Sequence, residues 1–218
     1  MIPSISILIT AYNVEKYIGR AVRSALNQSL DPKSYEIIVV NDCSTDRTRF
    51  ALEVFENDIR LLNNETRLGL PASLNRGIRK VKGQFVVRID GDDYVHRDFL
   101  KVLELHLRLN DEMDAVACDY LMVDDDEVIL GRGNVDQDPI ACAIMFRIEH
   151  LIDIGLYDEQ FFSLEDEDLR LRFLKKYSIN RVKLPLYRYR RHKNNMTNNV
   201  ERLGFYRTLL VEKHNQSE

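Results

Sequence analysis

Cysteine is scarce in this sequence, and its spacing excludes two structural devices. Three cysteines, Cys43, Cys118 and Cys142, occur among 218 residues, and none is part of a C-x-x-C pair. An odd number of widely spaced cysteines does not make a disulfide framework and lacks the ligand spacing of a zinc site. We therefore expect free thiols in a reducing compartment.

Long apolar runs are absent as well. The segment Met1–Thr10 is partly apolar, but it has no basic flank and no small-residue cleavage site. It is also far too short to span a bilayer, so it is read as a strand rather than a signal peptide. The chain is therefore expected to be soluble and cytoplasmic.

Glycine-rich phosphate loops are also missing. The sequence has no G-x-x-x-x-G-K-S/T segment and no G-x-G-x-x-G segment after a strand-like run. Such loops use glycine to bring backbone N–H groups close to phosphates, so a nucleotide bound here would need its charge neutralised in another way. No internal repeat, low-complexity tract or Gly/Ser linker divides the chain, which predicts one continuous unit.

Charge is unevenly distributed along the chain. The net charge is −4, yet residues 169–218 hold 13 Lys/Arg and only three Asp/Glu. A basic end on an acidic protein suggests attraction to phosphate, on a ligand or on an anionic lipid surface. It is equally consistent with a solvated face that forms ordinary ion pairs. Peripheral contact with the inner face of a membrane and a homodimer stay open, and no nucleic-acid partner is expected.

Strand-like and helix-like segments alternate through the first half. Apolar residues at helical spacing separate four continuous apolar runs, a pattern typical of a parallel sheet with right-handed crossovers. In this interpretation Asn13 caps the first helix and Gly83 ends the third. The four predicted strands are Ser4–Thr10, Tyr35–Val40, Ile59–Leu62 and Gln84–Ile89.

The rhythm changes after a helix predicted at Phe99–Leu109. Two strand-like segments joined by the acidic turn Asp124–Asp126 indicate a hairpin rather than another β-α-β unit. We predict an α/β fold with a Rossmann-like, mostly parallel central sheet flanked by helices, and a smaller mixed sheet. The later strands are expected at Ala115–Val123, Glu127–Leu130, Ala141–Phe146 and Arg181–Tyr189, and the later helices at Glu149–Ile154, Glu165–Tyr177 and Arg202–Glu212.

Polar clusters follow three of the predicted strands. They are Thr10–Asn13, Asn41–Asp42 and Asp90–Asp93, and ligands bind beyond the carboxyl ends of strands in open parallel sheets. The last cluster could be an ordinary Asp/Gly turn. However, three adjacent carboxylates repel one another unless a cation lies among them, and Mg²⁺ or Mn²⁺ is commonly shared between carboxylates and phosphates. We therefore expect a divalent metal site here.

A second acidic cluster spans Glu165–Asp168. Carboxylates in the first turn of a helix are favoured by the macrodipole, and Asp168 can pair with Arg172 one turn later. Four carboxylates exceed what the helix end needs, so one of them could face a cleft as a general base. The sequence leaves both interpretations open.

Five segments, in sequence order, resemble the family 2 glycosyltransferases, which have the GT-A fold. The resemblance implies a nucleotide-sugar-binding half in residues 1–98 and an acceptor-binding, catalytic half in residues 99–218 of the same continuous domain. The segments are Ser4–Asn13, Ile37–Asp46, Leu68–Asp93, Ile154–Arg172 and Tyr187–Thr197.

The resemblance also implies roles for residues around the donor. Asp90 and Asp92 form the D-x-D motif, with Asp92 the metal ligand and Asp93 its possible substitute; a Mn²⁺ or Mg²⁺ ion is the implied cofactor. Thr10, Tyr12 and Asp42 would contact the nucleotide base and ribose.

At the other end of the site, the resemblance makes Asp166 the general base, with Glu165 beside it. His192 would complete the metal or diphosphate contacts, helped by Arg188 or Arg191. The implied reaction is a single displacement: the base takes a proton from the acceptor hydroxyl, which attacks the anomeric carbon and inverts it.

The function implied is metal-dependent transfer from a UDP-sugar to the hydroxyl of a carbohydrate or lipid-linked acceptor, in cell-surface polysaccharide or glycolipid synthesis. The alternatives are a sugar-nucleotidyltransferase and a non-catalytic nucleotide-sugar-binding protein. Two departures from the family pattern stand out: Leu74 replaces a common arginine, and Pro139–Met145 lacks the glycines expected beside the acceptor pocket.

Overall fold

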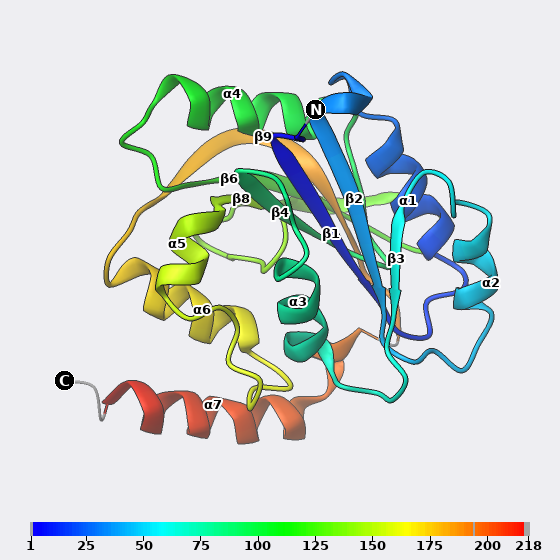
Figure 1. Ribbon diagram of the computed structural model, residues 1–218. Helices are drawn as coiled ribbons and strands as arrows, with labels where there is room; N and C mark the ends of the chain where they lie inside the picture. The colour runs from blue at the N-terminus through cyan, green and yellow to red at the C-terminus, as the bar shows by residue number, and fades with distance from the viewer. Residues whose placement is uncertain (1, 194, 216–218) are drawn as a thin grey trace.

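A computed structural model describes residues 2–193 and 195–215 of the chain. Within them a nine-stranded sheet has the order β3-β2-β1-β4-β8-β6-β9-β5, and β7 pairs with β6 outside this path. The sheet passes through both halves of the sequence (Figure 1). Its strands are β1 (Ile5–Ala11), β2 (Tyr35–Asn41), β3 (Arg60–Asn63), β4 (Phe85–Asp90), β5 (Tyr94–Val95), β6 (Ala115–Val123), β7 (Ile129–Gly133), β8 (Ile144–Arg147) and β9 (Ile179–Arg190).

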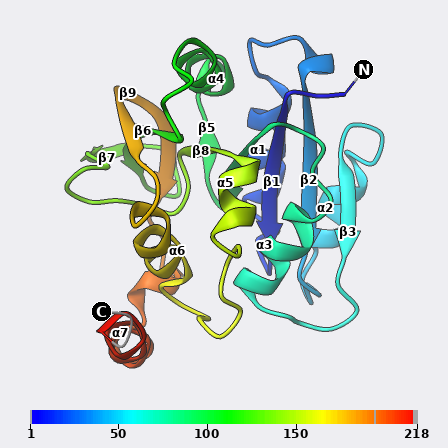
Figure 2. The ribbon, with the colours of Figure 1, turned by 60° about the vertical axis from the view of Figure 1, so that its left-hand side comes forward.

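The parallel part of the sheet consists of β3, β2, β1 and β4. All residues of β1 are buried, and β2 is buried except for one half-buried residue, as their continuous apolar sequences predict. Strand order runs outward from β1 to β3 and then returns to β4. Right-handed crossovers therefore place α1 (Ile18–Leu26) and α2 (Thr48–Glu53) on one face and α3 (Leu70–Ile78) on the other (Figure 2).

The remaining strands make the sheet mixed. β8 runs antiparallel to both β4 and β6, β9 is parallel to β6, and β5 is antiparallel to β9. β6 and β7 form the predicted antiparallel hairpin. The predicted α/β fold is thus confirmed. The other helices are α4 (Phe99–Leu109), α5 (Ile148–Asp153), α6 (Glu165–Leu174) and α7 (Val200–Asn215), with short 3₁₀ turns η1 (Pro32–Ser34) and η2 (Met196–Asn198).

Two local predictions are wrong. Asn13 does not cap α1, which begins at Ile18; its side chain instead accepts a hydrogen bond from the Thr45 backbone N–H at 2.8 Å. Gly83 does not end α3, whose last residue is Ile78. A Cβ on Gly83 would lie 2.6 Å from the Ser6 backbone nitrogen, so glycine is needed there for close approach to β1.

Strand register brings the polar clusters to one edge. Thr10 pairs with Asp90 across β1 and β4, and Ala11 pairs with Asn41 across β1 and β2. In Figures 1 and 2, α7 lies beside α6 on the side toward which these strand ends point. Nowhere in the described segments is there a helix both long and apolar enough to cross a bilayer.

Candidate active site

A cavity of about 1160 Å³ opens at the carboxyl ends of β1 and β4. Its walls come from these strand ends, the loop 137–142, the start of α6, the segment after β9, and α7. Most of the residues predicted from the sequence line it: Thr10, Tyr12, Asp42, Asp90, Asp92, Asp93, Glu165, Asp166 and His192.

Asp42 is buried beside the loop that leads into α3. Its carboxylate accepts hydrogen bonds from the Asn64 side chain at 2.7 Å and from the backbone N–H groups of Leu68 at 2.8 Å and Gly69 at 2.9 Å. Gly69 can present its N–H because its φ is +90°, a backbone conformation that residues with a side chain rarely adopt. The Asp42 side chain therefore fixes the loop that forms one wall of the cavity.

Tyr12 carries a cation on its ring. The Arg67 guanidinium carbon lies 3.9 Å from the ring centroid, which is cation–π stacking distance, and both residues line the cavity. Sequence reasoning missed Arg67, because its partner is 55 positions away and no motif joins the two.

Leu74 is fully buried, so that position offers no phosphate contact.

The aspartates after β4 have different surroundings. Asp92 Oδ2 lies 2.9 Å from His192 Nε2. The His192 ring also stacks on Tyr17, with centroids 5.0 Å apart. The structure therefore brings the predicted pair Asp92 and His192 together at the cavity wall.

Asp93 is buried behind them. It accepts hydrogen bonds from the Tyr187 hydroxyl and the Arg190 backbone N–H, each at 2.7 Å. Burial, followed by repulsion from Asp92 and Asp90, raises the pKa of Asp93 well above its usual range. This is the repulsion between neighbouring carboxylates that a cation would relieve.

Cys142 is an unexpected neighbour of this group. Its Sγ lies 3.5 Å from Asp90 Oδ2 and 3.8 Å from Asp93 Oδ2, and among the described residues these three offer ligand atoms within 4.8 Å of one another. Burial raises the pKa of the Cys142 thiol well above its usual value. Mg²⁺ and Mn²⁺ prefer oxygen and imidazole donors to sulfur, so the carboxylates and His192 suit these ions better than the thiol does. The donor set fits such an ion.

Arg88 connects this cluster to α6, and sequence reasoning missed it. The guanidinium is buried; its Nε lies 2.6 Å from Asp90 Oδ1 and its Nη1 lies 3.0 Å from Glu165 Oε1. Arg88 sits two residues before Asp90 on β4, so both side chains lie on the same face of the strand. It thereby neutralises carboxylates from two distant parts of the chain.

Glu165 and Asp166 both have a raised pKa. Burial, then repulsion from Asp166, raises the pKa of Glu165 to about 7, although Arg88 opposes the shift. Burial likewise raises the pKa of Asp166, with Arg88 again opposing. Glu165 is committed to Arg88, whereas Asp166 faces the cavity with its side chain only partly covered. A raised pKa makes an ionised carboxylate in a cavity a stronger proton acceptor.

The rest of the acidic cluster is structural. Asp168 is fully buried and lies 2.7 Å from Arg172 Nη2 and 2.7 Å from Lys213 Nζ of α7. The predicted pairing of Asp168 with Arg172 is therefore confirmed. Glu167 pairs with Arg207 of α7 at 3.3 Å. The cluster thus both contributes to the cavity and holds the last helix.

Arg188 and Arg191 do not line the cavity. The Arg188 guanidinium donates to the Pro185 carbonyl at 2.6 Å, and that of Arg191 lies 3.5 Å from the Thr197 hydroxyl. A diphosphate contact by either residue would require its side chain to turn from this partner.

Comparison with known proteins adds a family and a fold. The sequence matches the family described as Glycosyl transferase family 2 over residues 6–157. The protein EpsH of Bacillus subtilis is 26% identical, over 98% of this chain and 68% of EpsH. The poly(ribitol-phosphate) beta-N-acetylglucosaminyltransferase TarS of Staphylococcus aureus is 35% identical, over 44% of this chain but only 17% of TarS.

Two solved structures are similar over most of this chain. TarS 1–349 in complex with UDP-GlcNAc has a TM-score of 0.78 at 22% identity, covering 90% of this chain and 61% of that one. The mannosyltransferase PcManGT from Pyrobaculum calidifontis, in complex with GDP-Man and Mn²⁺, has a TM-score of 0.77 at 18% identity, covering 98% and 64%. The chain therefore spans a little under two thirds of these structures, and the likeness shows the fold.

Proposed function

The chain is a member of glycosyl transferase family 2, and from this premise we propose that it transfers a sugar from a UDP-sugar to an acceptor hydroxyl, inverting the anomeric carbon. The observation that carries the proposal is Asp166. It is a carboxylate of raised pKa that faces the cavity, next to a Glu165–Arg88–Asp90 chain that leads to the D-x-D motif. This arrangement supports the assignment of Asp166 as the proton acceptor, in the same cavity as the D-x-D motif.

The donor nucleotide is assigned to the end of the cavity near Thr10, Tyr12 and Asp42. Arg67 on the Tyr12 ring gives this end a flat cationic surface. UDP is favoured because similar structures hold UDP or UDP-GlcNAc, although another holds GDP-Man. The Asp42 carboxylate already accepts three hydrogen bonds, which leaves limited acceptor capacity for a base N–H.

A divalent cation is assigned to Asp92 and His192, with Asp93 next to them. Their oxygen and imidazole donors fit Mn²⁺ or Mg²⁺, and PcManGT is an example of a similar structure with Mn²⁺. When bound, such an ion offsets the negative charge on a nucleoside diphosphate leaving group.

Asp166 and Glu165 have different roles in the proposed transfer reaction. Asp166 accepts the proton of the acceptor hydroxyl, whose oxygen forms a bond to the anomeric carbon while the bond to the nucleoside diphosphate breaks. Glu165 is assigned a positioning role rather than that of the base, because its carboxylate is held by Arg88. Attack on the face opposite the leaving group inverts the configuration.

The acceptor is assigned to the α6–α7 side of the cavity. We expect a carbohydrate or lipid-linked acceptor, in polysaccharide or glycolipid synthesis; the name of the relative TarS gives poly(ribitol-phosphate) for that protein. The proposed peripheral membrane contact would be tested by flotation with vesicles that contain anionic lipid; equal recovery with neutral vesicles would remove it. The proposed homodimer would be tested by light scattering.

The test of the proposed function is release of UDP from a panel of UDP-sugars in the presence of Mn²⁺. We expect at least one sugar donor to be turned over, slowly to water and faster once an acceptor is found. A chain that binds UDP-sugars but releases no UDP from any of them would instead be a nucleotide-sugar-binding protein.

A further inference from the structure

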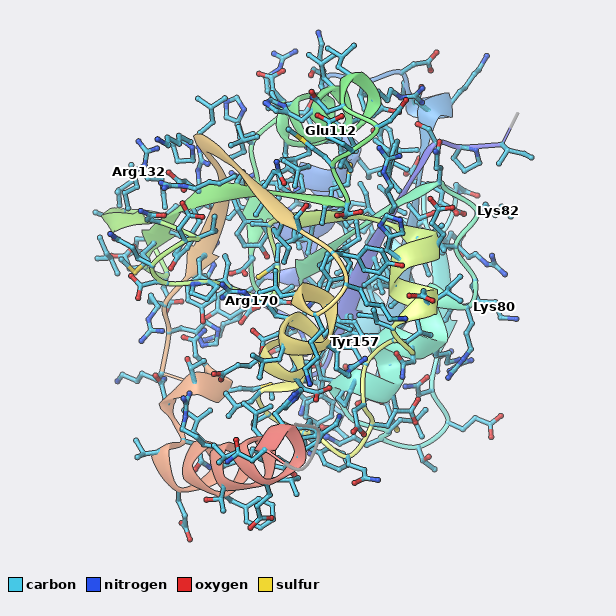
Figure 3. All side chains as sticks on the ribbon, turned by 90° about the vertical axis from the view of Figure 1, so that its left-hand side faces the viewer. Lys80, Lys82, Glu112, Arg132, Tyr157 and Arg170 are labelled. Carbon is cyan, nitrogen blue, oxygen red and sulfur yellow. The ribbon has the colours of Figure 1, made fainter. Side chains whose placement is uncertain are left out.

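We propose that the acceptor carries an anionic group, a phosphate or a carboxylate, and that Arg170 receives it beside Asp166. The proposal rests on the proposed function, because Asp166 marks where the acceptor hydroxyl reacts. Asp166 and Arg170 are four residues apart on α6, so their side chains lie on one face of the helix, and both line the cavity. Figure 3 shows Arg170 extending from α6.

The guanidinium of Arg170 is not neutralised by the protein. In the described parts of the chain it has no hydrogen bond or ion pair, and it does not pair with Asp166 although the spacing would allow it. The other carboxylates of this turn are engaged: Glu165 with Arg88, and Asp168 with Arg172. A half-buried guanidinium that lines a cavity and makes no ion pair favours an anionic ligand.

Helix α7 adds positive charge to the same cavity. Arg202 and Arg207 line the cavity, with Leu203 and Tyr206 between them. The Arg202 guanidinium donates to the Phe162 carbonyl, a neutral partner that leaves its charge uncompensated, whereas Arg207 pairs with Glu167. Two of the three arginines therefore present net positive charge to whatever occupies this side.

This charge lies on the acceptor side rather than with the donor phosphates. In an inverting displacement the nucleophile and the leaving group are on opposite faces of the sugar ring, so the base and the diphosphate are also on opposite sides. Arg170 is on the helix that carries the base, one turn further along. Asp92 and His192, to which the diphosphate side is assigned, lie on other elements.

Ser163 supplies a second polar group at this wall. It lies three residues before Asp166, lines the cavity, and is 3% exposed. Within the described residues its hydroxyl has no hydrogen-bond partner. Buried hydroxyls are normally satisfied, so Ser163 is available to a polar group of the acceptor.

The experiment compares charged and neutral probes on the enzyme saturated with UDP and Mn²⁺. Calorimetric titration would measure ribitol 5-phosphate against ribitol, and glucuronate against glucose, which distinguishes phosphate from carboxylate. We expect one anionic probe to bind about tenfold tighter than its neutral partner, as a charge-assisted bidentate contact allows. The variant R170Q should lose that preference, and R170K should keep part of it.

Lys175→Gln is the matched control, since it removes the same charge from the exposed end of α6 outside the cavity. It should keep the preference, and all variants should unfold at nearly the wild-type temperature. Equal affinity for charged and neutral probes, or no binding of either anion, would overturn the proposal. So would a loss of UDP affinity in R170Q as large as its loss of probe affinity, because Arg170 would then contact the donor. Failure of the wild type to bind UDP at all would instead refute the proposed function.

Discussion

Neighbouring acidic residues at the start of α6 take different roles because their surroundings differ. Glu165 is buried against Arg88, Asp166 faces the cavity, and Asp168 is buried among cations of α6 and α7. Burial raises the pKa of the first two, whereas hydrogen bonds from Lys213 and Arg172 outweigh burial at Asp168 and lower its pKa. The cluster therefore separates into a positioning group, a base and a structural anchor.

The role of Asp166 is tested by replacing it with asparagine. Because the amide cannot accept the hydroxyl proton, we expect Asp166→Asn to lower the transfer rate by roughly 10²- to 10⁴-fold and to leave UDP affinity unchanged. Rate assays and calorimetry would measure the two effects. Asp153→Asn, which alters an exposed pair with Lys176, serves as the control. Equal loss of rate and of UDP affinity would show that Asp166 is structural.

The pH profile of transfer follows from the same pair. Since the pKa of Glu165 is about 7 and that of Asp166 is also raised, the pair protonates as the pH falls, and we expect kcat/KM to decline below about pH 7. Arg88 lowers both values, so R88M should move this decline to higher pH. An unchanged profile in R88M would contradict the account.

The same shift affects stability with a definite sign. The pKa of Glu165 is higher in the folded protein than its ordinary value of 4.5, so the folded state binds an extra proton between pH 4.5 and about 7. The contribution of Glu165 to stability is therefore greatest below pH 4.5 and is lost as the pH rises toward 7.

Single residues could be predicted where a motif carries them. Asp90, Asp92 and Asp166 stand in recognisable segments, and all three line the cavity. Arg88 and Cys142 were not found, because their significance depends on contacts with residues 77 and 52 positions away. No local pattern encodes such contacts.

At the scale of elements, α7 depends on the anchor Asp168. Lys213 and His214 of α7 lie 2.7 Å and 3.0 Å from its carboxylate, and Lys213 also reaches Asp158 at 2.7 Å. Leu210 is the buried residue of this helix, and the ion pairs to Asp168 and Asp158 are a main part of its attachment. The sequence predicted the helix but gave no indication of where it docks.

Asp168→Asn tests this docking. Breaking a buried ion pair by removing one partner typically costs about 3–5 kcal/mol, and we expect a loss of this order in the free energy of unfolding. Compared with the wild type, the variant should show faster hydrogen exchange across α7 but unchanged exchange in α1, which does not contact Asp168. Uniformly faster exchange in both helices would mean that Asp168 supports the whole fold and not α7 in particular.

Element boundaries were less predictable than element types. The helix expected at Glu165–Tyr177 ends at Leu174, and β7 begins at Ile129 rather than Glu127. The two-residue strand β5 was not predicted, because it is defined by pairing with β9 and not by a pattern of its own. Tertiary contacts set these limits.

At the scale of the whole molecule, topology explains why the site could be anticipated. Alternating strands and helices predicted the parallel part of the sheet, and the register of β1 with β2 and β4 brings the polar clusters together. The order of β8, β6 and β9 could not be deduced, because antiparallel and parallel pairings there join segments far apart in sequence. The α6–α7 side of the cavity, to which the acceptor is assigned, follows from that part of the fold. This side was therefore the least predictable part of the site.

The proposed dependence of UDP binding on a divalent cation at Asp92 is tested most directly by calorimetry. UDP is titrated into the wild type and into Asp92→Asn, with and without Mn²⁺. The carboxylates at the edge of the sheet should repel the diphosphate unless a cation is present, so we expect tight binding by the wild type only with Mn²⁺. Asp92→Asn should weaken that binding by about tenfold or more, as loss of a metal ligand or its support does. Metal-free binding as tight as binding with Mn²⁺, or an unchanged affinity in Asp92→Asn, would contradict the account.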